Sequence, residues 1–211
     1  RLANVGIDIE TLDFYHDPSK GAIRRAKKAL MALGALTISG EVTDIGRAME
    51  RFPVESNYAR MLVEADKYTE EVQAKLAAII AIQEVGGIVK GGTSFTGWRA
   101  YTKQNKSDLL AQYDVYLALP NIAEFDYEDL GINAKNVDKA GEVIERLHHD
   151  LGMLDVELLA IEPEEELLLL QCITAGEIDQ IWYVIDEHNT VEHIFSGQQR
   201  ELSSSTVVRN P

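Results

Sequence analysis

The sequence is short of the features that disulfide-bonded and membrane proteins need. It contains one cysteine, Cys172, which excludes an internal disulfide and fits a reducing compartment, so we expect a cytoplasmic protein. The longest aliphatic run, Leu167 to Leu170, is far too short to cross a bilayer. The sequence shows no signal-peptide pattern, and Arg1 stands where a start Met would be, so we expect a fragment of a longer protein with no membrane partner.

Motifs that hold a nucleotide or a metal ion are also missing. No G-x-x-x-x-G-K-[ST] phosphate loop occurs, because the stretch from Gly91 to Ser94 has loop character but no lysine. His148 and His149 are adjacent on a predicted helix and diverge by about 100°, so they cannot easily share a metal ion. We therefore predict no catalytic residue, no metal ligand and no cofactor within this sequence.

The net charge of -15 is distributed unevenly along the chain. Residues 1–123 carry 15 acidic and 15 basic side chains, whereas residues 124–211 carry 20 acidic and 5 basic ones. Nucleic acid binding depends on the neutralisation of phosphates. We therefore expect only the first part to face RNA, and the acidic part to face solvent or a basic protein partner.

Hydrophobic periodicity and capping residues predict a mainly helical chain. The expected helices span residues 20–33, 43–51, 56–66, 69–85, 107–119, 133–151 and 162–175. Thr43, Ser107 and Asn133 are suitable N-caps, and Gly152 is a suitable C-terminal residue for the long helix.

Short strands are predicted at both ends of the chain. Residues 35–43 alternate around Ser39-Gly40 and predict a small hairpin, and residues 181–185, 191–195 and 205–208 predict three strands with a turn at residues 187–189. Helix, hairpin and helix in this order indicate a winged helix. The expected fold class is mainly α with small β elements. The expected domains are a winged helix (1–54), a helical bundle (55–176) and a β-rich region (177–211).

The best candidate for a binding function is the segment of residues 85–107, which has no acidic side chain. It interleaves cations with aromatic rings: Lys90, Phe95, Trp98, Arg99, Tyr101, Lys103 and Lys106. Cations for phosphates and rings for stacking hold single-stranded nucleic acid, at about 1–3 kcal/mol per stacked base. The alternative interpretation is that Trp98 fills the core of the bundle and the cations are merely solvated.

Further cations lie on three predicted helices. They are Arg24, Arg25, Lys27 and Lys28 on the first, Arg47 and Arg51 on the second, and Lys135, Lys139 and Arg146 on the long one. Lys139 and Arg146 are candidates to border RNA, and the alternative is a salt-bridged, exposed face. For the first helix, a solvated face or contact with another protein domain fits better than RNA.

Residues 33–53 resemble a motif of a known family. The residues are Leu33-Gly34-Ala35-Leu36, Gly40, the run from Val42 to Met49, and Phe52-Pro53. In this order they are similar to the start of the helicase-associated region of DEAH-type, HrpA-like ATP-dependent RNA helicases. Residues 107–116 and 133–151 are similar to later helices of that region, the second to its ratchet helix. Residues 173–176 resemble the entry to its OB-like barrel. The Gly-rich loop and the acidic C-terminal part depart from the pattern.

The resemblance implies an accessory module consisting of a winged helix, a ratchet-like bundle and an incomplete OB-like domain. It implies a parent chain with two RecA-like motor domains that bind ATP and Mg²⁺. The bundle would close one wall of the single-stranded RNA channel. Arg24, Arg25, Lys28 and Arg47 would dock the module to the motor.

Two other classes of function remain open. The first is a non-enzymatic protein-interaction module whose acidic half binds a basic partner. The second, a DNA-binding winged-helix regulator, is disfavoured because the helix before the hairpin offers few polar residues that could contact bases.

Overall fold

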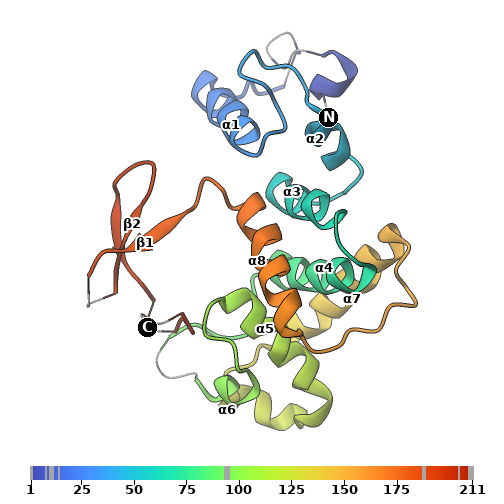
Figure 1. The fold of residues 1–211 in the computed structure, drawn as a ribbon, viewed down its shortest axis with the longest axis vertical. Coiled ribbons are helices and arrows are strands. Elements are labelled where there is room, and N and C mark those ends of the chain that lie inside the picture. The colour runs from blue at the N-terminus through green and yellow to red at the C-terminus, as the bar shows by residue number, and fades with distance from the viewer. Residues whose placement is uncertain are drawn as a thin grey trace. The chain divides into compact units, whose positions relative to one another are not determined.

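The computed structural model describes residues 2–7, 9, 12–13, 15–92, 96–186, 189–203 and 205–208. Contacts divide the chain into two compact units (Figure 1), which are Arg1–Lys67 with Leu170–Ile181 (unit 1) and Tyr68–Leu169 with Trp182–Pro211 (unit 2). Helices dominate and the β elements are small, so the predicted fold class is confirmed. The three predicted domains are a different partition of the chain and stay a prediction.

Unit 1 has the predicted order of helix, hairpin and helix. Its elements are η1 (Leu2–Val5), α1 (Lys20–Ala32), α2 (Asp44–Met49), α3 (Ser56–Ala65) and the second half of α8 (Pro163–Gly176). Between α1 and α2 the chain reverses, and Leu36 and Val42 form an antiparallel bridge. The hairpin is therefore a single bridge rather than a pair of full strands.

Thr43 and Gly46 fix α2 against the end of α1. The Thr43 hydroxyl accepts a hydrogen bond from the Gly46 N–H (3.0 Å) and donates one to the Gly34 carbonyl (2.6 Å). A Cβ on Gly46 would lie 2.3 Å from the Ala35 carbonyl oxygen. One hydroxyl and one absent side chain therefore set this junction.

The stretch of residues 170–181 completes unit 1. The Asn57 amide donates to the Glu177 carboxylate (2.9 Å), and a Cβ on Gly176 would lie 2.5 Å from the Asn57 carbonyl oxygen. Cys172 is fully buried, and this burial raises the pKa of its thiol to about 12. A thiol must ionise to react, so the Cys172 thiol is unreactive at neutral pH. We therefore assign Cys172 to the core.

Unit 2 is built around α4. Its elements are α4 (Glu70–Glu84), η3 (Gly97–Tyr101), α5 (Asp108–Ala118), η4 (Leu119–Asn121), η5 (Glu124–Asp126), α6 (Tyr127–Leu130), α7 (Ala134–Leu151), the first half of α8, β1 (Trp182–Val184), β2 (Thr190–His193) and β3 (Gln199–Glu201). Every side chain of α4 from Ala74 to Ile82 is buried, and α5 and α7 pack against this helix (Figure 1). A helix that is apolar on all sides must be covered on all sides. Its one buried cation, Lys75, pairs with Glu165 of α8.

Most helix signals in the sequence are confirmed. Ser107 caps α5 by accepting from the Leu110 N–H (3.4 Å), and Asn133 caps α7 by accepting from the Asn136 N–H (3.3 Å). Gly152 ends α7 in the left-handed conformation, with φ of 72°. The short helices between residues 119 and 130 were not predicted, because most of their residues are exposed and show no apolar period.

The small sheet has the strand order β1-β2-β3 and is antiparallel throughout. The predicted strands at 181–185 and 191–195 are confirmed in shorter form, whereas the strand predicted at 205–208 is wrong. The third strand is β3, and Thr206 and Val207 bond instead to Asp108 of α5. Of the predicted turn, Glu187 and His188 lie outside the described residues.

Within the described part of the chain, no helix combines the length and the apolar character that crossing a bilayer requires.

Replacing Gly46 with alanine tests the close approach of α2 to Ala35. We expect Gly46→Ala to lower the free energy of unfolding of unit 1 by about 2–3 kcal/mol, because the added methyl group meets backbone rather than a flexible side chain. Gly21→Ala in α1 is the matched control, since its Cβ would meet only side chains at ordinary contact distance, Arg25 at 3.6 Å and Ser19 at 3.9 Å. It should raise stability by about 0.5 kcal/mol in the same urea titration. Equal effects of the two substitutions would contradict the described junction.

Candidate nucleic-acid interface

The first part of the basic segment, residues 85–107, is anchored to unit 2 by its backbone. The Ile88 N–H donates to the Gln112 side-chain oxygen (2.8 Å), and the Asn136 amide donates to the Gly87 carbonyl (2.7 Å). Gly87 has a φ of 84°, and a Cβ there would lie 2.7 Å from the Gln112 side chain. The segment therefore leaves α4 along a fixed path, although the sequence predicted only a loop.

The second part of the segment forms η3 and buries Trp98. This ring is 2% exposed, and a Cβ on the preceding Gly97 would lie 3.0 Å from the Leu130 Cα. A buried ring cannot stack on a base, so the prediction that Trp98 contacts RNA is corrected here. The alternative interpretation, in which Trp98 fills the core, describes its position.

The cations of the segment differ in how accessible they are. Lys103 and Lys106 are exposed, and the Lys106 ammonium forms an ion pair with Glu166 (2.7 Å). Arg99 is half-buried and donates to the Thr206 carbonyl (3.0 Å). Lys90 and Tyr101 are also half-buried. The accessible positive charge therefore lies at the C-terminal end of the segment.

Although the basic segment contains no acidic residue, a carboxylate from another helix lies beside it. The Asp114 carboxylate of α5 accepts from the Thr102 hydroxyl (2.8 Å). Burial raises the pKa of Asp114, while the Thr102 hydrogen bond and, more weakly, the charge of Lys103 act to lower it. Asp114 therefore fixes the backbone beside Lys103 and offsets part of its charge.

The stretch of residues 205–208 covers the start of α5. The Asp108 carboxylate accepts from the Thr206 hydroxyl (2.6 Å) and from the Val207 N–H (2.7 Å), and Val207 is buried. Together with the Arg99 bond, these contacts fasten the stretch across the second part of the basic segment. No signal in the sequence pointed to this long-range contact.

The predicted cations of α7 behave differently from one another. Lys139 is exposed, and the Arg146 guanidinium pairs with Glu84 of α4 (3.0 Å). The alternative interpretation, a salt-bridged face, describes Arg146. The predicted RNA contact of Lys139 stays a prediction.

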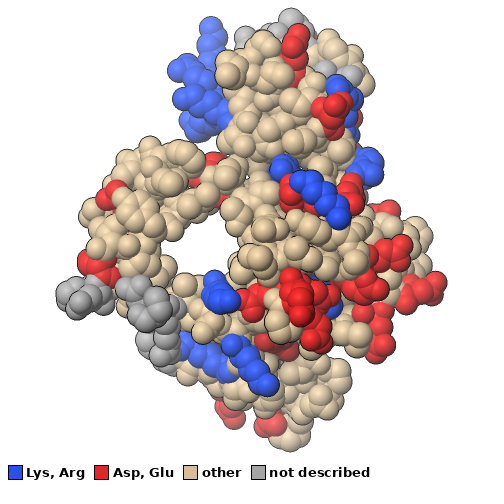
Figure 2. All heavy atoms as spheres, viewed as in Figure 1, with Lys and Arg blue, Asp and Glu red and all other residues tan. Residues whose placement is uncertain are grey.

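The predicted docking cations lie in unit 1. Arg24, Arg25 and Lys28 are exposed on α1, and Figure 2 shows the blue atoms of Lys and Arg gathered over this helix. Arg47 donates to the Val42 carbonyl (3.0 Å) and pairs with Asp44, so it holds α2 to the hairpin. Its contribution to docking stays a prediction.

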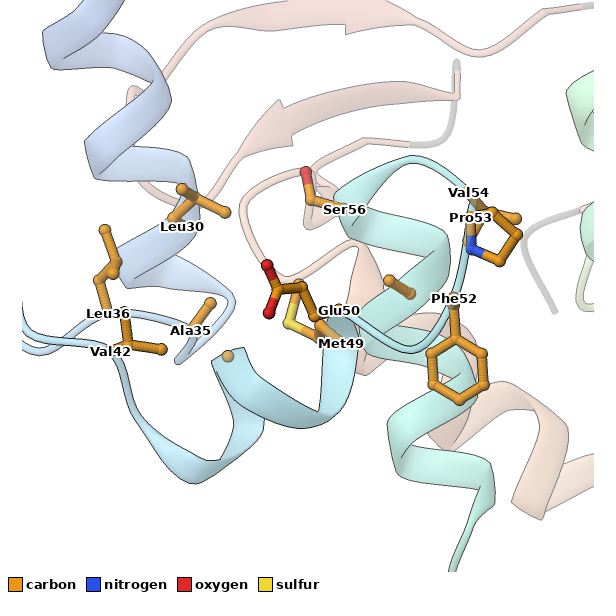
Figure 3. Close-up of a pocket in the computed structure, with 12 residues that line it drawn as sticks. Leu30, Ala35, Leu36, Val42, Met49, Glu50, Phe52, Pro53, Val54 and Ser56 are labelled. Atoms are coloured by element: carbon orange, nitrogen blue, oxygen red, sulfur yellow. The ribbon is translucent and has the colours of Figure 1, made fainter. Parts of the chain in front are cut away.

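Unit 1 also has a pocket of about 380 Å³ at the junction of α1, α2 and α3 (Figure 3). Leu30 and Leu36 lie on one side, Phe52 and Pro53 on the other, and the Glu50 carboxylate lies between them. The mainly apolar lining suits an apolar protein side chain better than a phosphate. Among the residues that the structure describes, no three His, Cys, Asp or Glu side chains are grouped as metal ligands.

The structure thus defines a mainly helical protein with a basic segment in one unit and a basic helix in the other. About a third of the chain is homologous to part of several RNA helicases. It is 41% identical over 66 residues to the ATP-dependent RNA helicase HrpA of Borreliella burgdorferi and 36% identical over 83 residues to the pre-mRNA-splicing factor ATP-dependent RNA helicase DEAH10 of Arabidopsis thaliana. It is 31% identical over 70 residues to the ATP-dependent RNA helicase DHX33 of Drosophila melanogaster.

These matches cover 31%, 37% and 32% of this chain, in the order given, and 8%, 12% and 10% of the three relatives. The chain therefore spans only a small part of the length of the curated relatives it matches. No protein-family model matches the chain. The homology supports the resemblance to DEAH-type, HrpA-like RNA helicases.

Substitution of Asp108 tests the contact with residues 205–208. We expect Asp108→Asn to speed amide hydrogen exchange at Val207 at least tenfold, because an amide is a weaker acceptor than a carboxylate for the two hydrogen bonds. Thr206→Val should have a similar but smaller effect at Val207, since it keeps the charge of Asp108 and removes only the Thr206 hydroxyl, which donates to Asp108 and accepts from the Val208 N–H (3.1 Å). Exchange at Leu110 within α5 serves as the internal control. Unchanged exchange at Val207 in both variants would contradict the contact.

The raised pKa of Asp114 predicts a dependence of stability on pH. Since the folded state holds this proton more tightly than the unfolded state, the stabilisation is complete below the unfolded pKa and is lost as pH rises through the folded one. Relative to Asp114→Asn, the unchanged protein should therefore lose stability as the pH rises above the unfolded pKa of about 4. Urea titrations across this range measure the difference. If the unchanged protein instead loses stability relative to Asp114→Asn as the pH falls, the hydrogen bonds to the carboxylate outweigh its burial.

Proposed function

We propose that the chain is an accessory module of a DEAH-type ATP-dependent RNA helicase and that its basic segment contacts single-stranded RNA. The observation that carries the proposal is the homology of a third of the chain to RNA helicases. The exposed Lys103 and Lys106, at the end of an anchored segment, provide the positively charged surface that contact with RNA requires. Such a protein would act in the cytoplasm.

The proposed RNA contact uses cations whose backbone is already fixed. Lys103 and Lys106 meet phosphates, and Arg99 and Tyr101 lie at the edge of the same surface. Because the segment is bonded to Gln112, Asp114 and the start of α7, little chain entropy is lost when RNA binds. Lys90 and Lys139 extend the proposed contact to weaker positions.

Unit 1 is the proposed docking element. Its hairpin and helices form the proposed winged helix, and Arg24, Arg25 and Lys28 are free to meet an acidic face of a RecA-like motor domain in the same parent chain. ATP and Mg²⁺ would be bound by that motor and not by this module. The sheet β1-β2-β3 is the proposed start of an OB-like domain.

A titration with labelled single-stranded RNA at several salt concentrations tests the RNA contact. We expect Lys103→Ala/Lys106→Ala to weaken binding and to reduce the slope of log K against log salt concentration by about 1.4, since each phosphate contact on a single strand contributes about 0.7. The measurement is fluorescence polarisation of the labelled RNA. Trp98 is left unchanged because its loss would damage the core.

Lys20→Ala/Lys28→Ala in α1 is the matched control, because it makes the same change in net charge on unit 1. It should leave the salt slope unchanged. Loss of binding in both variants would indicate a response to net charge alone. If neither variant affects RNA binding, the basic segment is not the contact.

The second candidate function is a protein-interaction module with an acidic face that binds partners. The observation that favours it is the excess of acidic over basic side chains, 20 to 5, in residues 124–211. This function and the helicase module are compatible, since they use different surfaces.

A further inference from the structure

In the stretch between α7 and α8 of unit 2, several backbone N–H groups have no hydrogen-bond partner among the described residues. Residues 156–162 form neither helix nor strand, and Figure 1 draws them as an outstretched trace. In the described part of the chain, no group accepts a hydrogen bond from the N–H of any of residues 157–161. Exposed, unpaired backbone in an outstretched segment is a template for another strand.

One hydrogen bond shows which side of this stretch faces outward. The buried Tyr113 hydroxyl donates to the Leu159 carbonyl (2.8 Å), so the polar backbone groups of Leu159 face the bundle. In an extended segment, the N–H and C=O of one residue point to the same side and those of its neighbours to the other. The backbone groups of Leu158 and Ala160 therefore face away from Tyr113, where a second chain can reach them.

The side chains around this edge combine exposed apolar groups with carboxylates that pair with no described cation. Leu154 and Leu159 are 63% and 55% exposed. The neighbouring carboxylates are those of Asp155, Glu157, Glu162 and Glu164. None of these four forms an ion pair with a described residue, and residues 150–166 contain seven acidic and no basic side chains. Figure 2 shows acidic atoms gathered on this side of unit 2.

We propose that residues 154–162 are a docking edge for an extended peptide segment of a partner protein in which basic and apolar side chains alternate. Its backbone pairs with Leu158 and Ala160, its cations meet Glu157 and the neighbouring carboxylates, and its apolar side chains cover Leu154 and Leu159. Strand addition of this kind takes affinity from the backbone and specificity from alternate side chains. This inference goes beyond the proposed RNA contact and uses a different surface of unit 2.

Two other occupants fit the edge less well. RNA would bring phosphates against the carboxylates, which repel them. A second copy of the chain would bring the same acidic stretch, or another part of a chain whose net charge is -15. A basic protein segment alone matches both the charge and the open backbone.

The test uses the whole chain and a labelled eight-residue peptide of alternating Lys and Val, read out by fluorescence anisotropy and amide hydrogen exchange. We expect binding, together with slower exchange at Leu158 and Ala160 and no change in unit 1. A peptide with N-methyl groups on alternate residues keeps the charge but cannot pair along that edge. When methylated on its pairing edge it should bind at least tenfold more weakly.

Variants of the chain separate pairing from charge. Ala160→Pro removes one outward N–H and should weaken binding at least tenfold, whereas Ala160→Ser keeps the N–H and should bind as the unchanged chain does. Glu157→Gln should weaken binding and lower its salt dependence. Circular dichroism verifies that Ala160→Pro remains folded, and the N-methylated peptide gives the same answer without any substitution.

Three results would overturn the proposal. The first is the absence of peptide binding. The second is equal binding of the plain and N-methylated peptides, which would reduce the edge to a patch of negative charge. The third is slower exchange at Leu158 and Ala160 caused by single-stranded RNA or by raising the protein concentration alone, which would assign the edge to RNA or to a second copy. None of these results depends on whether Lys103 and Lys106 bind RNA.

Discussion

The burial of α4 on all its sides is the constraint on which unit 2 depends. Small alanine side chains between Leu76 and Ile82 let α5 and α7 approach this helix closely. Lys75 is the exception within this apolar surface, and a buried ammonium must be paired. Glu165 provides that partner, so the position of one cation on α4 fixes where α8 begins. The path of the basic segment depends on the same packing, because the segment begins at the end of α4 and its first residues form hydrogen bonds with α5 and α7.

Charge in this protein is organised by contacts that are distant in sequence. Lys106 meets Glu166, Arg146 meets Glu84, and Arg99 meets a carbonyl near the C-terminus. Some cations of a basic stretch are thereby used within the fold, while Lys103 is left exposed. By contrast, no described cation forms an ion pair with the acidic side chains between α7 and α8. The two candidate surfaces differ for this reason and not because of local composition alone.

The elements could be predicted where the signal was local. The caps Thr43, Ser107 and Asn133 act within three residues of themselves, and the left-handed Gly152 ends α7 where an apolar period also ends. The hydrophobic pattern likewise located every long helix to within a few residues.

The candidate site was less predictable because its geometry depends on long-range partners. The sequence around Trp98 predicts an accessible ring in a polar loop. In the structure the ring is buried, and Gly97 beside it packs against Leu130. The Val207-Val208 pair predicts a strand, but the Val207 N–H donates to the Asp108 carboxylate instead of to a neighbouring strand. The open backbone of residues 157–161 has no sequence signal, because unpaired N–H groups are a property of the fold.

The two-part construction of unit 1 has a consequence for synthesis of the protein on the ribosome. Its first part ends at Lys67, and the part that completes it, Leu170–Ile181, follows only after the 102 residues from Tyr68 to Leu169. At about 5–20 residues per second, the first part waits roughly 5–20 s for the residues that cover Asn57 and Met61. During that interval the apolar side of α3 is open, and it is then that a nascent chain is most exposed to aggregation and most dependent on chaperones.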